Sequence, residues 1–173
     1  LTLSKQSPTT ASAASPGVLA IAKVDDFDPV ADGGSGAENP KQAKRAIDGD
    51  PETAWTTERY RKLAAFGGLK PGVGLVLDLG ASHTLSSVAL EVTGAGTALE
   101  LRVPAEADDS APMKSQAQWT AVAGVADAAG KVTLDLTGPA PRTRYLLVYL
   151  TSLPPVGNGF FRGGITGVEV TGS

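Results

Sequence analysis

A short acidic turn in the sequence has the residue types of a calcium site. In "AIDGDPETAWTT" (residues 46–57), Asp48 and Asp50 flank Gly49, and Thr53 follows. Glycine permits a positive φ and aspartate favours turns, so the chain can fold back tightly here. Carboxylate, hydroxyl and carbonyl oxygens brought together in such a turn suit a hard cation such as calcium. The alternative is an Asx turn without metal, in which Thr53 caps a neighbouring backbone group.

Two other segments, "TERYRKLAAFGG" (57–68) and "VGNGFFRGG" (156–164), combine basic and aromatic residues. Aromatic faces stack on pyranose rings and arginine supplies a fork of donors, so these segments could hold a sugar or an anionic glycan. The alternative is a pair of solvated loops whose aromatic residues tuck into the edge of the fold. Two adjacent aromatic residues, Phe160 and Phe161, cannot both point inward on a strand. The candidate glycan-binding residues are Arg59, Tyr60, Arg61, Phe161 and Arg162.

The residues needed for common catalytic centres are missing or badly spaced. The chain has no cysteine and a single histidine, His83, which excludes a cysteine nucleophile and a two-histidine metal motif. Ser82, His83 and Asp78 lie too close along one strand to build a catalytic triad. "GGLKPGVG" (67–74) lacks the spacing of a phosphate-binding loop. No acidic residue lies in a context that predicts a raised pKa, so we expect a protein that is not an enzyme.

Composition narrows the class of partner. The 173 residues carry a net charge of −3, and no basic excess predicts a surface for nucleic acid or for a membrane. No apolar run is long enough to span a bilayer. The 21 glycines and 12 prolines, spread along the chain, favour many short strands joined by turns.

Apolar and polar residues alternate with a period of two in several segments. This period is typical of antiparallel strands that expose one face to solvent. Since no amphipathic helix of ordinary length separates them, two sheets must bury their apolar faces against each other. We therefore predict an all-β antiparallel sandwich, with Trp55 and Trp119 in its core. One or two helical turns are expected at 41–47 and long polar loops at 25–40 and 104–118. The expected strands are 18–24, 73–79, 84–92, 97–103, 131–136, 145–150 and 164–170.

The first 17 residues, "LTLSKQSPTTASAASPG", have the composition of a flexible linker. They lack the charged and apolar regions of a signal peptide. Because the chain starts with leucine and then a linker, we expect it to be cut from a longer protein. The predicted organisation is a linker at 1–17 followed by one domain at 18–173.

The order of several motifs resembles a known family. The segment 46–57 precedes a strand ending in "LDLG" (77–80), "RYLLVYLTS" (144–152) comes late, and "GITGVEVTG" (164–172) closes the domain. This order resembles the discoidin family, also called the coagulation factor V/VIII C-terminal type, which belongs to the galactose-binding-like jelly rolls. "FDPVADGGSGAENP" (27–40) and the segment 58–80 look more closely like the extracytoplasmic C-terminal domain of actinobacterial MviN-type proteins, the lipid II flippase family.

The resemblance implies a jelly-roll sandwich and a non-catalytic binding module for a cell-wall or other carbohydrate. The module would be extracytoplasmic and tethered through an upstream segment to a membrane protein of peptidoglycan synthesis. Another extracytoplasmic protein is a further expected partner, and the alternative is a structural or protein-interaction domain without sugar binding. In the family, the acidic turn often wraps a structural Ca²⁺. The matching ligands here are Ala46 through its carbonyl, Asp48, Asp50, Thr53 and Glu169.

Overall fold

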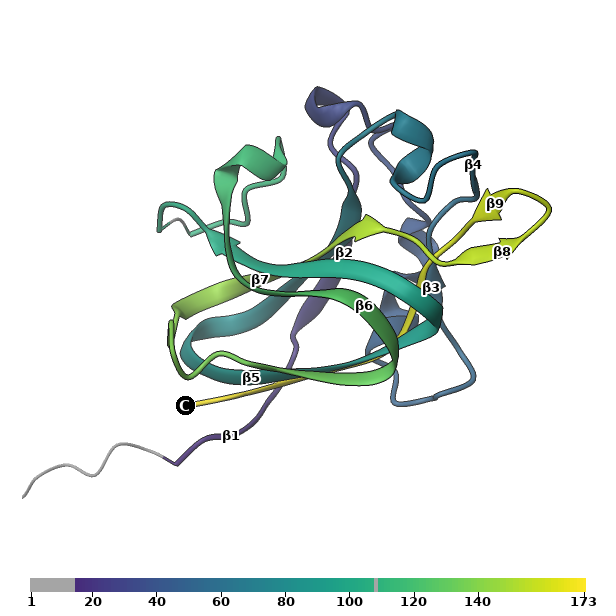
Figure 1. Ribbon diagram of the computed structural model, residues 1–173. Coiled ribbons are helices and arrows are strands. Elements are labelled where there is room, and N and C mark those ends of the chain that lie inside the picture. The colour runs from purple at the N-terminus through teal and green to yellow at the C-terminus, as the bar shows by residue number, and fades with distance from the viewer. Residues whose placement is uncertain (1–14, 108) are drawn as a thin grey trace, which may run out of the picture.

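Antiparallel strands stacked in two layers make up most of the computed structural model, which describes residues 15–107 and 109–173 (Figure 1). The helical segments are short 3-10 turns: η1 (Val30–Asp32), η2 (Pro40–Ala46), η3 (Phe66–Gly68) and η4 (Gln116–Gln118). The strands are β1 (Gly17–Leu19), β2 (Lys23–Phe27), β3 (Trp55–Thr56), β4 (Tyr60–Arg61), β5 (Val73–Pro104), β6 (Trp119–Asp135), β7 (Arg142–Ser152), β8 (Pro155–Gly157), β9 (Phe160–Phe161) and β10 (Gly164–Gly172).

Strand β5 is three predicted strands joined into one. The segments 73–79, 84–92 and 97–103 all lie within its bounds. The chain turns corners at Gly80, Gly94 and Gly96, where φ is positive, at 79°, 70° and 107°. Glycine adopts such angles without steric cost, so the strand can pass from one layer to the other without a separate loop.

The two layers share β5 and β6. In the first layer, residues 73–78 of β5 pair with β2 on one side and β7 on the other, and β7 also pairs with residues 98–102 of β5. In the second layer, residues 85–92 of β5 lie between β10 and the later half of β6, while β1 and β3 pair with β10. This antiparallel jelly roll is the fold class that the sequence predicted. A small separate sheet of β4, β9 and β8 lies beside the sandwich (Figure 1).

The core lies between the layers and contains Trp55 as predicted, whereas Trp119 is buried in a second cluster outside it. Trp55 is fully buried and Trp119 is 5% exposed. Strand β7 is buried on both faces, because Tyr145–Leu150 are all buried. The outer face of β7 carries Tyr145, Leu147 and Tyr149, which form a second apolar cluster with Phe27, Val76 and Trp119.

The loop that follows β5 covers this second cluster. The Tyr145 hydroxyl donates to the carbonyl of Asp109 at 2.8 Å, and the Trp119 indole donates to that of Pro112 at 2.7 Å. These bonds hold the loop predicted at 104–118 against the outer face of the first layer. Both sides of β7 are therefore dry, which explains its unbroken apolar sequence.

The N-terminal third differs in detail from the prediction. The strand expected at 18–24 is divided into β1 and β2, and β2 continues to Phe27 into the expected loop 25–40. The expected helical turns at 41–47 form η2. The linker expected at 1–17 lies outside the described residues up to position 14, and Gly17 begins β1 by pairing with Gly172. Within the described ranges, no helix is long and apolar enough to cross a membrane.

Candidate functional site

The acidic turn closes through its own hydrogen bonds. The backbone N–H of Asp50 donates to Oδ1 of Asp48 at 2.9 Å, and the Thr53 hydroxyl donates to Oδ2 of Asp48 at 2.5 Å. The Thr53 hydroxyl also lies 3.2 Å from the Asp50 carbonyl. These bonds, the Thr53 hydroxyl first, hold the pKa of Asp48 below its ordinary value. The local structure is therefore an Asx turn, the alternative to a calcium site for this segment.

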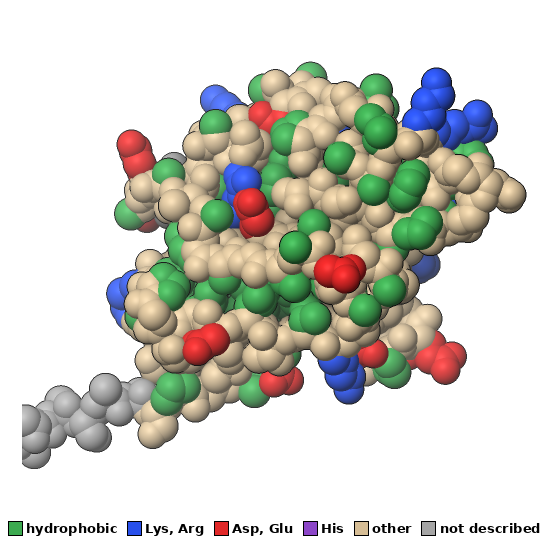
Figure 2. Space-filling model, in the orientation of Figure 1, with side chains coloured by type: hydrophobic (Ala, Val, Ile, Leu, Met, Phe, Trp, Pro, Cys, Tyr) green, Lys and Arg blue, Asp and Glu red, His purple; other side chains and the backbone are tan. Residues whose placement is uncertain are grey.

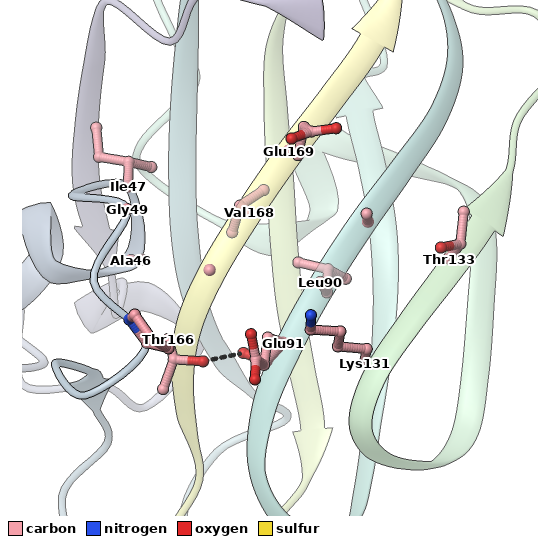
Figure 3. A pocket seen from close by; sticks show the side chains of 13 residues that line it. Ala46, Ile47, Gly49, Leu90, Glu91, Lys131, Thr133, Thr166, Val168 and Glu169 are labelled. Carbon is pink, nitrogen blue, oxygen red and sulfur yellow. Dashed lines mark hydrogen bonds between the residues drawn. The ribbon is translucent and has the colours of Figure 1, made fainter.

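The other two predicted calcium ligands lie at the edge of a hollow beside this turn. Ala46, Gly49 and Glu169 are among the residues that line a pocket of about 510 Å³ on the outer face of β10, β5 and β6 (Figure 3). Its floor is made partly of small residues, Ala89 and Gly167. Within 15–107 and 109–173, no group of three or more His, Cys, Asp or Glu side chains could hold a metal. Calcium would therefore depend on carbonyl and hydroxyl oxygens as well as on Asp48.

The small sheet brings together two arginines and one phenylalanine from the predicted glycan segments. Arg61 pairs directly with Phe160 across β4 and β9. The guanidinium carbon of Arg61 lies 4.7 Å from the centre of the Phe160 ring, and that of Arg59 lies 5.6 Å from it. Both arginines are exposed. Figure 2 shows blue side chains gathered at the upper right, where β4 and β9 lie in Figure 1. We call Arg59, Arg61 and Phe160 the arginine face.

The other three predicted glycan residues point toward the protein. Tyr60 is 6% exposed, and Phe161, opposite it across the small sheet, packs against the main core. The Arg162 guanidinium donates to the carbonyl of Thr57 at 3.0 Å and to the hydroxyl of Thr56 at 2.9 Å. The segment therefore alternates, with Arg59 and Arg61 outward and Tyr60 inward.

An ion cluster that the sequence did not indicate lies below β4. Lys70 Nζ lies 2.8 Å from Oδ1 of Asp28 and 3.4 Å from Oε2 of Glu38. All three side chains are buried, with exposures of 7% or less. The Glu38 carboxylate also accepts from the Tyr60 hydroxyl at 2.8 Å and from the backbone N–H of Glu58 at 2.6 Å. This buried ion cluster ties the loop after β2 to both β4 and the approach to β5.

The cluster corrects our expectation that no carboxylate has a raised pKa. Burial raises the pKa of Glu38, and the bonds from Glu58 and Tyr60 and the charge of Lys70 oppose that rise. Because Glu38 is 1% exposed and fully hydrogen bonded, it has no access to a substrate. The only local hint was Lys70, a lone charge in "GGLKPGVG"; its partners lie 42 and 32 residues away.

The fold is similar to that of solved carbohydrate-binding modules. The CBM32 module of AlyQ, solved with 4,5-unsaturated mannuronic acid, has a TM-score of 0.58 and 16% identity, with 89% of this chain and 97% of that chain covered. Chitosan-binding module 1 of a chitosanase/glucanase from Paenibacillus sp. IK-5 has a TM-score of 0.56 and 20% identity, covering 86% of this chain and 92% of that one. Module 2 of the same enzyme, solved with chitotriose, has a TM-score of 0.56 and 17% identity, covering 86% and 94%. No family model matches the chain.

These similarities place the chain in a fold class. It is an antiparallel jelly-roll sandwich of the galactose-binding-like type, as the discoidin resemblance implied. At identities of 16–20% the similarity shows the fold alone, so the nature of any ligand depends on the residues of this chain.

Proposed function

We propose that this chain is a non-catalytic carbohydrate-binding module whose glycan site is the arginine face. The observation that carries the proposal is the pair of exposed guanidiniums over the Phe160 ring. Two donor forks can hold sugar hydroxyls, and the Phe160 ring beneath them helps to fix the two guanidiniums at the surface. The shared fold with modules solved in complex with chitotriose and mannuronic acid supports it.

A polysaccharide screen tests this function. Migration of the chain in native gels should slow when a bound polysaccharide is embedded in the gel, and sedimentation with insoluble peptidoglycan should deplete it from solution. The double variant Arg59→Gln/Arg61→Gln should lose the retardation that the wild type shows. If no polysaccharide or peptidoglycan preparation retains the wild type, the function is wrong.

The cellular setting that we propose rests on the sequence resemblance. The MviN-type motifs in 27–40 and 58–80 favour an extracytoplasmic domain attached to a membrane protein of peptidoglycan synthesis. Cell-wall glycan would then be the natural ligand, and binding would position the membrane partner at its substrate. Immunodetection of the full-length protein in cell fractions, with and without protease treatment of intact protoplasts, tests this setting.

A protein-interaction domain is the second candidate function, and exposed apolar side chains on the loops favour it. Val30, Leu63 and Leu69 are 70%, 55% and 69% exposed. Exposed apolar groups mark a protein contact when they form one contiguous patch. A chain that no glycan retains, but that co-purifies with a membrane protein through these three side chains, would be assigned this function.

We also propose that the acidic turn can take calcium as a structural ion. Asp48 and Thr53 already converge there, and the Ala46 carbonyl and Glu169 border the adjoining pocket.

A further inference from the structure

We propose that the arginine face selects saccharides that carry an oxyanion, such as the carboxylate of a uronic acid. The inference rests on the proposed function and names the class of sugar that this site prefers. It follows from a comparison of all the cation–π contacts among residues 15–107 and 109–173.

In three of these contacts the cation also binds a carboxylate of the protein. Arg102 lies 4.5 Å from the ring centre of Tyr149 and also pairs with Glu100 at 2.7 Å. Arg144 stacks on its own neighbour, Tyr145, and pairs with Asp78 at 2.8 Å. Each guanidinium is thus neutralised within the fold.

Lys70 follows the same rule in the interior. Its ammonium lies 5.2 Å from the ring centre of Tyr60 and is held by both carboxylates of the buried ion cluster. Elsewhere in the described chain, therefore, a cation held over an aromatic ring has an acidic partner as well.

The arginine face departs from this rule. Neither Arg59 nor Arg61 has a carboxylate within 4 Å in the described residues, although both lie over one ring and repel each other. Exposed Lys62 adds a third positive charge beside them. Exposed Glu58 precedes Arg59 but forms no ion pair with either arginine, so residues 59–62 keep three cations and no paired carboxylate. An anionic ligand would supply the missing partner.

The backbone segment that carries Arg59 and Arg61 is fixed by hydrogen bonds to the rest of the protein. Tyr60, between the two arginines, points inward and donates to Glu38. The N–H of Lys62 donates to the carbonyl of Gly159 at 3.2 Å, which joins the end of β4 to the loop before β9. A fixed strand loses little backbone entropy on binding, which lowers the cost of holding a ligand at the arginine face.

The chemistry of the guanidinium then selects the ligand. Each planar fork offers two parallel N–H groups that match the two oxygens of a carboxylate. A neutral sugar hydroxyl accepts a single, weaker bond and leaves both positive charges uncompensated. Carboxylate, phosphate and sulfate all have the required oxygens, so the shared requirement is an oxyanion on the saccharide.

Matched ligands test the selection by isothermal titration calorimetry. The probes are an oligogalacturonate, its methyl ester, which lacks the charge and carries one added methyl group on each carboxyl, and a sugar-phosphate polymer as the phosphate arm. We expect the acid to bind at least about 10-fold tighter than the ester and to weaken with added salt, because exposed charges are screened. Tighter binding of the phosphate polymer than of the oligogalacturonate would support selection of an oxyanion and would identify that oxyanion as a phosphate.

Variants assign the effect to the arginine face. Arg59→Gln and Arg61→Gln should each lower the affinity for the acid about 10-fold without changing that for the ester, and Arg61→Lys should give an intermediate loss because it keeps charge without the fork. Lys131→Gln, an exposed cation at the pocket beside β10, is the matched control and should bind as the wild type. Equal binding of acid and ester by the wild type would overturn the selection but leave sugar binding intact. A Lys131→Gln loss equal to those of the arginine variants would also overturn it, and failure of every saccharide to bind would overturn the proposed function with it.

Discussion

The hydroxyl of Tyr60 lies 2.8 Å from Oε1 of Glu38, and both side chains are buried beneath the strand that presents Arg59 and Arg61. This hydrogen bond connects the exposed arginine face to the buried ion cluster, which no ligand can reach. Because Tyr60 is fixed from inside, its neighbours Arg59 and Arg61 point outward. The buried ion cluster is thus the support of the proposed site, and its contribution to stability can be measured.

Tyr60→Phe removes one donor from the Glu38 carboxylate and keeps the aromatic ring. We expect the free energy of unfolding to fall by about 1–3 kcal/mol, since a buried acceptor loses a partner. Urea unfolding measures this as a lower midpoint with an unchanged slope. Tyr145→Phe is the control, because its hydroxyl donates to a carbonyl on an exposed loop, and a smaller loss is expected. Equal losses in the two variants would contradict a special role for the bond to Glu38.

Lys70→Met removes the cation and leaves two buried carboxylates facing each other. Breaking a buried ion pair from one side costs about 3–5 kcal/mol, and we expect a loss of that size. Lys23→Met is the matched control, because the pair of Lys23 with Asp25 is exposed and such pairs contribute about 0–1 kcal/mol. Thermal or urea unfolding of both variants gives the comparison. A loss below about 1 kcal/mol for Lys70→Met would mean that water reaches the cluster.

The ion pair of Arg144 with Asp78 should make stability depend on pH. The hydrogen bond from Arg144 holds the pKa of Asp78 below its ordinary 3.8, with a smaller contribution from the N–H of Gly80. The folded state therefore binds fewer protons than the unfolded state, and its extra stability is present above about pH 3.8 and lost as the pH falls through the lowered pKa.

Asp78→Asn tests this dependence. The variant should be less stable than the wild type at pH 7, and the difference should shrink as the pH falls below about 3.8. Urea midpoints measured between pH 7 and pH 3 check it, with Asp127→Asn, at an exposed position, as the control. A difference that stays constant over this range would assign the effect of Asp78 to packing rather than to charge.

Calcium is expected to raise the melting temperature through the acidic turn. An ion that binds only the folded state stabilises it by about 2.7 kcal/mol at 100 times its dissociation constant. A chelator should reverse the shift, and Asp48→Ala should abolish the response. Scanning calorimetry with calcium, with chelator and with magnesium as the comparison ion measures it. A melting temperature that does not change with calcium or chelator would mean that the turn binds no calcium. Asp48→Ala would then destabilise the protein only through the loss of its hydrogen bonds with Thr53 and Asp50.

Local pattern was sufficient for the fold class. Alternation in 84–92, 97–103 and 131–136 predicts strands with one buried face, because successive side chains on a strand point to opposite sides. The segment 145–150 in β7 lacks this alternation, and in the structure a loop covers its second face. Whether a face is wet depends on what lies over it, and the covering loop comes from another part of the chain.

The sequence by itself determined most strand segments of the two layers, but not β3, β4, β8 or β9. It also determined the buried tryptophans and a short set of basic and aromatic residues from which a glycan site could be built. The tertiary structure decided which of them face outward. Of the two adjacent phenylalanines we predicted Phe161 as the glycan residue, but the pairing of β4 with β9 sets Phe161 opposite inward Tyr60 and Phe160 opposite outward Arg61. It also brought Lys70 to Asp28 and Glu38, which lie 42 and 32 residues away. Residues so distant meet only when the chain folds, so no local pattern records their contact.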